Sequence, residues 1–205
     1  MKKNTKQTLP CSAVILSGGL NSRMGGNNKA FLNIGGTLII DRILNTLEQI
    51  FSDIILVTRQ PKLYEKWNIR VVEDLFDVRS SLTGIHAGLV NASQEHAFFV
   101  ACDTPFLKKE LVKTLLNHLE PDLDIIVPVI EDHYEPLCAI YSKQCIPFIE
   151  EQLQTDKLKI INLFDNVKVK TLEKEILTKH DPELISFFNV NTPQALEKSR
   201  SLNKE

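Results

Sequence analysis

The chain has 205 residues, a length that fits one α/β domain and is enough to bury a sizeable core. Apolar residues make up 43% and charged residues 24% of the chain, and the net charge is −2, as is ordinary for a soluble globular protein. Apart from a few lysines near the N-terminus there is no basic block, which argues against the basic face that broad nucleic-acid binding requires. No apolar run approaches the roughly 18 residues of a membrane span.

Targeting and cysteine patterns favour a cytoplasmic protein. The first apolar run, residues 13–16, is too short for the hydrophobic region of a signal peptide. The four cysteines form no C-x-x-C pair, so neither a zinc ribbon nor a thioredoxin motif is indicated. We expect a flexible N-terminus over residues 1–10 and a single domain over residues 11–205.

Strand and helix patterns alternate along the chain. Apolar residues at three- and four-residue spacing predict a helix within residues 38–50. Strands are expected at 13–16, 53–58, 69–73, 97–101, 124–129, 137–141, 167–171 and 187–190, and further helices at 85–90 (with Ser81 or Thr83 near its cap), 107–119, 146–153 and 194–202. This alternation predicts an α/β fold of three α/β/α layers, with a mostly parallel, Rossmann-like sheet and helices on both faces.

The loop after the first strand, residues 17–29, is the most informative segment. It contains four glycines together with Arg23 and Lys29. Glycines let the backbone turn tightly and approach a ligand, and free backbone N–H groups form an anion site. Arg23 can bind phosphate oxygens through its fork, and Lys29 can bind them as a point charge. The loop is therefore expected to hold a polyphosphate, and the alternative is an ordinary glycine-rich turn before a helix.

Two common phosphate-binding loops are excluded by the residues around Lys29. A Walker A loop requires Gly before the lysine and Ser or Thr after it, whereas this chain has Asn28 and Ala30. A Rossmann fingerprint requires G-x-G, and this chain contains no G-x-G. The loop must therefore belong to another class of nucleotide-binding protein.

Two aspartates follow predicted strands. Asp74 comes after the strand at 69–73, and Asp103 comes after the buried strand at 97–101. Ligands of parallel sheets bind at the carboxyl ends of the strands, so both residues are expected at one edge with the glycine loop. Mg²⁺ takes one or two protein carboxylates plus phosphates and water, which makes Asp103 the best metal candidate. The alternatives are a helix N-cap for Asp103 and a solvated turn carboxylate for Asp74.

The loop pattern L-x-G-G-x-x-S-R-M-G-G-x-x-K resembles the signature of nucleotidyltransferases that build nucleoside diphosphate conjugates. The double glycine at 25–26, the segment Cys-Asp-Thr-Pro at 102–105 and the segment Asn-Val-Asn-Thr-Pro at 189–193 make the chain most similar to one branch. This branch is the molybdenum cofactor guanylyltransferases, the molybdopterin-guanine dinucleotide biosynthesis protein A family. The resemblance implies a sheet of the nucleotide-diphospho-sugar transferase type. It also implies transfer of GMP from GTP to molybdopterin carrying molybdenum, with release of pyrophosphate.

The resemblance also implies roles for individual residues. The implied catalytic residues are Arg23, Lys29 and Asp103. The implied nucleotide contacts are Leu16, Ser17, Gly18, Gly19, Lys29, Asp74 and Asp103. Asp103 would bind Mg²⁺ or Mn²⁺, and Asn189 and Asn191 would contact the acceptor. The last segment has an equally good structural interpretation, in which Asn and Thr cap the final helix and Pro193 begins it.

The implied partners are GTP and molybdopterin, with molybdenum cofactor delivery proteins and molybdoenzymes as further partners, and neither nucleic acid nor a membrane. The chain departs from the family at two places: Val57 stands where many relatives have asparagine, and Ser80-Ser81 replace Gly-Pro. Selectivity for guanine is therefore less strongly indicated than triphosphate binding. One alternative is a cytidylyltransferase that uses CTP on molybdopterin or on a sugar or polyol phosphate. The other is a non-catalytic nucleotide-binding protein, against which the intact Arg23, Lys29 and Asp103 count.

Overall fold

The computed structural model describes residues 10–18 and 28–202 of the chain. The strands are β1 Cys11–Leu16, β2 Asn33–Ile34, β3 Thr37–Leu38, β4 Ile54–Val57, β5 Arg70–Val72, β6 His96–Ala101, β7 Ile125–Ile130, β8 His133–Tyr134, β9 Cys138–Ser142 and β10 Val169–Leu172. The α-helices are α1 Ile39–Leu47, α2 Ser81–Asn91, α3 Lys109–Asn117, α4 Ile146–Gln154, α5 Lys174–Leu177 and α6 Pro193–Leu202. Among these described helices, none has the length and apolar character that crossing a membrane requires.

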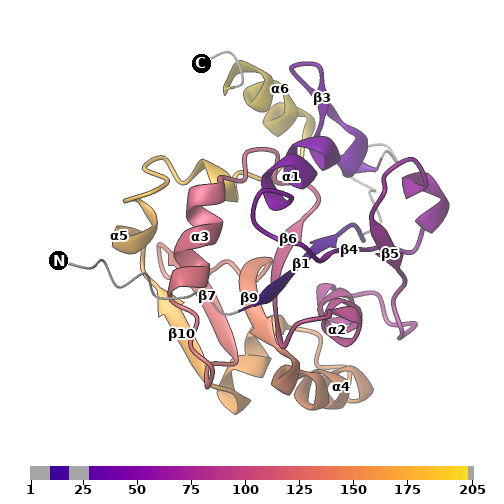
Figure 1. Ribbon diagram of the computed structural model, residues 1–205, viewed down its shortest axis with the longest axis vertical. Coiled ribbons are helices and arrows are strands. Elements are labelled where there is room, and N and C mark those ends of the chain that lie inside the picture. Colours follow the sequence, from indigo (N-terminus) through magenta and orange to yellow (C-terminus); the bar gives the residue numbers. More distant parts are fainter. Residues whose placement is uncertain (1–9, 19–27, 203–205) are drawn as a thin grey trace.

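Most of the strands form one mixed sheet, in the order β10-β7-β9-β6-β1-β4-β5 (Figure 1). The pairs β1–β4, β1–β6, β4–β5 and β7–β10 are parallel, and β9 runs antiparallel to both β6 and β7. The sheet is therefore mostly parallel, as the alternation of strands and helices predicted. Its central strands are continuous apolar runs, as expected for strands that are covered on both faces.

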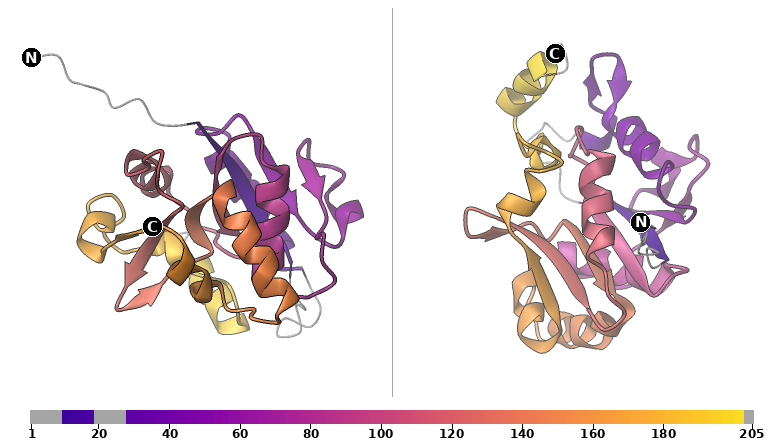
Figure 2. Two further views of the ribbon diagram at one scale, coloured as in Figure 1. Left: turned by 90° about the horizontal axis from the view of Figure 1, so that it is seen from below. Right: turned by 60° about the vertical axis from the view of Figure 1, so that its left-hand side comes forward.

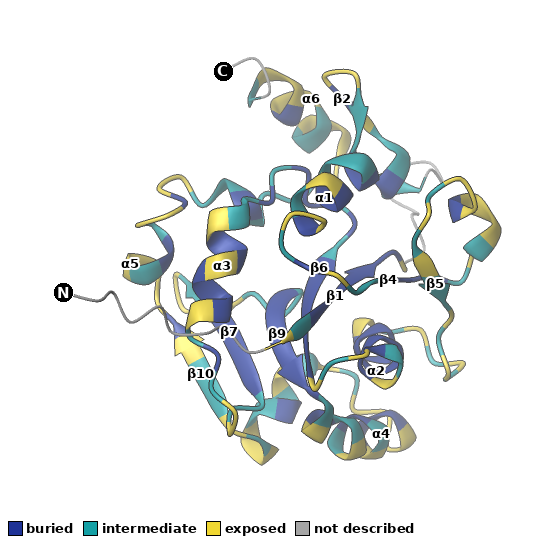
Figure 3. Cartoon of the chain, viewed as in Figure 1, coloured by how far each residue is buried: buried dark blue, intermediate teal, exposed yellow. Residues whose placement is uncertain are grey.

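Helices cover both faces of this sheet. Figure 1 shows α1 and α3 on one face and α2 and α4 on the other, and in Figure 2 α2 and α4 lie side by side. Side chains alternate along β1: Ala13 and Ile15 pack into the core under α1 and α3, whereas Val14 and Leu16 pack into the core under α2 and α4. The strands between the helices are the most buried part of the molecule (Figure 3). The predicted three-layer α/β/α architecture is confirmed.

The close approach of α2 to the sheet depends on Gly88. A Cβ atom at this position would lie 2.6 Å from the Phe99 ring and 2.7 Å from a methyl group of Val14. Any larger residue must therefore displace the helix or the strands beneath it.

Gly88→Ala is expected to destabilise the protein. The cost of overpacking, about 1–3 kcal/mol, should exceed the gain in helix propensity of up to about 1 kcal/mol. Urea unfolding measures the difference in the free energy of unfolding. Val90→Ala, at an exposed position of the same helix, is the control and should change that free energy by about 0.5 kcal/mol or less. A Gly88→Ala protein as stable as wild type would show that the layers are not tightly packed at this crossing.

One local prediction is wrong. The expected strand at 187–190 is instead the end of a 3₁₀ helix, Ile185–Phe187, followed by an irregular segment. Its residues are apolar because they pack against the core under α1 and α3, and a short apolar run does not by itself distinguish a strand from other buried backbone. The N-cap of α2 is Ser80, whose Oγ accepts a hydrogen bond from the Thr83 N–H at 3.1 Å, so Ser81 and Thr83 lie near the cap as expected.

Candidate active site

The carboxyl ends of four neighbouring parallel strands form the edge that carries the predicted site. In the order β6-β1-β4-β5, these ends lead into Asp103, Ser17, Arg59 and Asp74. The described ends of the glycine loop and the two aspartates, which lie far apart in the sequence, therefore meet at one edge of the sheet, as predicted. Gly19 and Arg23 lie outside the described residues.

Lys29 lies at the centre of a cluster built from three segments. It begins a 3₁₀ helix, Lys29–Phe31, and its Nζ lies 3.0 Å from Oδ2 of Asp103. The Lys29 ammonium also donates a hydrogen bond to Oδ1 of Asn191. The N–H of Val190 donates to the backbone oxygen of Asp103 at 2.9 Å, which anchors the C-terminal segment beside β6. The structure thus brings together Lys29, Asp103 and Asn191, three of the predicted site residues.

The capping interpretations of this cluster are resolved by the structure. Asp103 does not cap α3, because the N-cap residue of that helix is Lys108 and receives no side-chain hydrogen bond. Thr192 does cap α6: its Oγ1 accepts a hydrogen bond from the Ala195 N–H at 3.1 Å, and Pro193 is the first helical residue. The Asn191 side chain therefore faces Lys29 while its neighbour caps the helix.

Asn189 lies in the same C-terminal segment as Asn191, but its side chain is not part of the Lys29 cluster. Its backbone oxygen accepts a hydrogen bond from the Asn191 N–H at 3.2 Å, and its side chain makes no hydrogen bond within the described residues. The side-chain amide of Asn189 is thus available to a ligand.

Tyr64 holds the start and the end of the glycine loop, and the sequence did not reveal it. Its hydroxyl makes a hydrogen bond with Oγ of Ser17 and accepts one from Nδ2 of Asn28 at 2.9 Å. The ring is fully buried and packs against Phe31 with 5.1 Å between ring centroids. Burial raises the pKa of Tyr64 to about 12, so the hydroxyl stays protonated at neutral pH. No local pattern indicates this role, because Tyr64 lies 47 residues beyond Ser17.

The backbone at the start of the loop is partly used by the sheet. The N–H of Ser17 donates to the Val57 carbonyl at 2.9 Å, and the Leu16 carbonyl accepts from the N–H of Cys102 at 3.0 Å. Of the predicted contacts at 16–18, Gly18 is the exposed one. The backbone thus offers a ligand fewer free groups than the sequence alone suggests.

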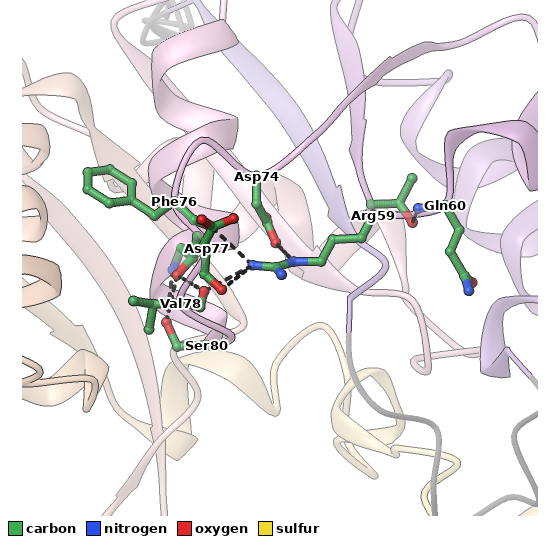
Figure 4. Close-up of polar contacts among 9 residues, drawn as sticks. Arg59, Gln60, Asp74, Phe76, Asp77, Val78 and Ser80 are labelled. Carbon is green, nitrogen blue, oxygen red and sulfur yellow. Dashed lines mark hydrogen bonds and ion pairs between the residues drawn. The ribbon is translucent and has the colours of Figure 1, made fainter.

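Asp74 is not the solvated turn carboxylate of the alternative interpretation. Its Oδ2 lies 2.6 Å from Nε of Arg59, in a pair that joins the loop after β5 to the loop after β4 (Figure 4). The Asp74 side chain is 14% exposed and faces its partner rather than bulk water. Arg59 is the second residue that the sequence analysis did not identify.

The chemistry of the edge is electrostatic rather than nucleophilic. Burial raises the pKa of the Cys102 thiol to about 11, so this cysteine next to Asp103 remains protonated. In the part of the chain that the structure describes, no three His, Cys, Asp or Glu residues form a group that could hold a metal ion. The site therefore offers a cation, Lys29, and a carboxylate, Asp103, with one oxygen unpaired among the described residues.

Two cavities, of about 440 and 510 Å³, lie at the opposite edge of the sheet. Cys11, at the start of β1, lines the first, and His96, at the start of β6, lines the second. Parallel sheets bind ligands at the carboxyl ends of their strands, so neither cavity competes with the Lys29 cluster as the active site.

A mostly parallel sheet with a lysine paired to an aspartate at its carboxyl edge agrees with the nucleotidyltransferase class that the loop pattern predicted. The structure is similar to that of molybdopterin-guanine dinucleotide biosynthesis protein A from Archaeoglobus fulgidus, with a TM-score of 0.81 and 28% identity over 94% of this chain and 98% of that one. A 4-diphosphocytidyl-2C-methyl-D-erythritol synthase from Anaerococcus prevotii shares the fold, with a TM-score of 0.70 and 18% identity over 96% of this chain and 97% of that one.

Residues 13–166 match the MobA-like NTP transferase domain, and the chain belongs to this family. It is 42% identical over 193 residues to the molybdenum cofactor guanylyltransferase of Desulfosudis oleivorans, covering 94% of this chain and 96% of the relative. It is 39% identical over 194 residues to a probable molybdenum cofactor guanylyltransferase of Natranaerobius thermophilus, covering 92% and 94% of the two chains. The chain is thus a nucleotidyltransferase of the branch that the loop pattern indicated.

Proposed function

We propose that this protein transfers GMP from GTP to molybdopterin carrying molybdenum, forming the guanine dinucleotide cofactor and pyrophosphate. The name of the 42% identical relative supplies the substrates. The observation that carries the proposal is the contact of Lys29 with both Asp103 and Asn191, because it joins the phosphate loop to the two segments that resemble the metal and acceptor sites of the family.

In the proposed reaction, an oxygen of the terminal phosphate of the acceptor attacks the α-phosphorus of GTP. The bond from the α-phosphorus to the bridging oxygen breaks, and pyrophosphate leaves with its electron pair. The attacking phosphate is already an anion at neutral pH, so no strong general base is required. Charge grows on the phosphate oxygens, and Lys29 is positioned to stabilise it.

Asp103 fits a divalent cation. Mg²⁺ is commonly held by one or two carboxylates together with substrate phosphates and water, and Asp103 offers a carboxylate oxygen that no described residue occupies. We propose Mg²⁺ or Mn²⁺ as the metal, which would neutralise charge on the triphosphate when bound. Lys29 holds the other oxygen of Asp103, and so orients the carboxylate.

The acceptor is proposed to bind beside Asn189 and Asn191. Asn191 already contacts Lys29, so an acceptor held by this segment lies next to the cation that binds the phosphates. Proximity of this kind accelerates a transfer between two bound anions. Molybdenum cofactor delivery proteins and molybdoenzymes are the proposed partners before and after this step.

The expected result of a direct assay is pyrophosphate release from GTP, Mg²⁺ and molybdopterin, and far less from CTP or ATP. Melting temperatures with each triphosphate give an independent measure, because a ligand that binds only the folded state stabilises it. Release with CTP instead of GTP would establish the cytidylyltransferase alternative. A rise in melting temperature with GTP but no pyrophosphate from any acceptor would establish a non-catalytic nucleotide-binding protein.

A further inference from the structure

Arg59 lies in the loop after β4, and its side chain contacts the loop between β5 and α2. Its Nε lies 2.6 Å from Oδ2 of Asp74 (Figure 4). Its Nη2 lies within hydrogen-bond distance of three consecutive carbonyl oxygens, at 3.0 Å from Phe76, 3.2 Å from Asp77 and 3.2 Å from Val78. One guanidinium therefore fixes the carboxylate after β5 and the backbone that leads to α2.

The pair of Arg59 and Asp74 lies at the ends of β4 and β5, next along the edge from the Lys29 cluster. The phosphate cluster of Lys29 and Asp103 lies at the ends of β1 and β6. The segment around Val190 and Asn191 already covers that cluster from the C-terminal part of the chain. A nucleotide with its phosphates at Lys29 thus extends toward β4 and β5, where Arg59 and Asp74 form a pair without net charge.

Two neighbouring groups at the ends of β1 and β4 are not free to read a base. Val57 has no polar side-chain atom, and the N–H of Ser17 is bonded to its carbonyl. Arg59 and Asp74 each retain one free group: Nη1 of the arginine and Oδ1 of the aspartate have no partner among the described residues. Nη1 lies on the side of the guanidinium away from Asp74 (Figure 4), so Oδ1 is the free group that a base beside Asp74 meets.

We propose that Arg59 determines the base selectivity of this protein, by holding Asp74 so that the free carboxylate oxygen of Asp74 recognises guanine. This inference rests on the proposed function, because it assumes GTP as the donor. Guanine carries an amino donor at N2, which matches the free acceptor of Asp74. Adenine has no N2 amino group, so it leaves this acceptor without that partner.

Arg59 is also a positioning residue for the loop that ends at the cap of α2. The carbonyl of Val78 accepts from Oγ1 of Thr83 at 2.8 Å as well as from Arg59. A lysine is a point charge and lacks the rigid fork that holds a carboxylate and several carbonyls together. Arg59→Lys should therefore lose selectivity although it keeps the charge.

The test compares the affinities of wild type, Arg59→Ala and Arg59→Lys for GTP, ATP and inorganic tripolyphosphate, each with Mg²⁺, by calorimetry. Both variants should lower the preference for GTP over ATP by roughly tenfold, the factor expected when one hydrogen bond to a charged group is lost. Affinity for tripolyphosphate should stay within about twofold of wild type, since the Lys29 cluster is unchanged.

Arg70→Ala is the matched control. Arg70 also pairs with a carboxylate, Asp53 at 3.0 Å, and donates to a carbonyl, that of Asn91 at 2.7 Å, but it lies at the start of β5. Arg70→Ala should leave the preference for GTP over ATP unchanged. Melting curves identify a variant that does not fold. If Arg59→Ala does not fold, the preference of Arg59→Lys for GTP over ATP decides the test.

An unchanged preference for GTP over ATP in a folded Arg59 variant would overturn the inference, as would equal losses of GTP and tripolyphosphate affinity. Failure of the proposed function is a separate result: wild-type protein would then release no pyrophosphate from GTP and molybdopterin, whatever the Arg59 variants bind.

Discussion

Lys29→Ala is expected to lower kcat/KM for GTP on the order of 100-fold and to weaken triphosphate binding with it. The ammonium pairs with Asp103 where we propose that the phosphates bind, and a hydrogen bond from a charged group is worth up to about 3 kcal/mol. The variant also leaves Asp103 and Asn191 without their shared partner. Calorimetry with GTP and steady-state pyrophosphate release measure the two effects.

Lys29→Arg should rescue the Lys29→Ala loss poorly, because a planar fork does not replace a point charge held by two oxygens. Lys170→Ala is the matched control, since Lys170 pairs with Glu120 at 2.7 Å on β10, away from the site. It should retain wild-type GTP affinity and rate. Wild-type GTP affinity and turnover in Lys29→Ala itself would remove Lys29 from the phosphate site.

Asp103→Asn is expected to fold normally and to lose about 10²–10³ or more in kcat, by analogy with the removal of one preorganised electrostatic contact. The two side chains are nearly isosteric, and the Asn amide oxygen can still accept a hydrogen bond from Lys29. What disappears is the anionic ligand for the proposed metal. Pyrophosphate release measured against Mg²⁺ concentration should therefore show both a lower rate and a higher Mg²⁺ requirement.

Asp53→Asn separates this effect from a general loss of stability. Asp53 accepts hydrogen bonds from the hydroxyls of Ser12 and Ser93, and it lies at the amino edge of the sheet. Its asparagine variant should lower the melting temperature and leave the Mg²⁺ dependence of the rate unchanged. If Asp103→Asn turned over normally at limiting Mg²⁺, Asp103 would have no part in metal binding.

The fold class and the placement of Lys29, Asp74 and Asp103 at one edge of the sheet could be predicted from the sequence alone. Continuous apolar strands alternating with amphipathic helices are local patterns, and they were sufficient for a mostly parallel three-layer sheet. Because parallel strands end at a common edge, the sequence alone places Asp103 and Asp74 on the side of the glycine loop. Lys29 could be assigned because it closes that loop within a single continuous motif.

The tertiary structure decided which side chains meet at that edge. Asn191 contacts Lys29 across 162 residues, and Tyr64 reaches Ser17 and Asn28 from a separate 3₁₀ helix. Arg59 could not be identified as the partner of Asp74, because the contact exists only when β4 and β5 are neighbours, and strand order is a property of the whole chain. Local propensity and spacing carry no information about such partners, which are selected by packing between distant segments.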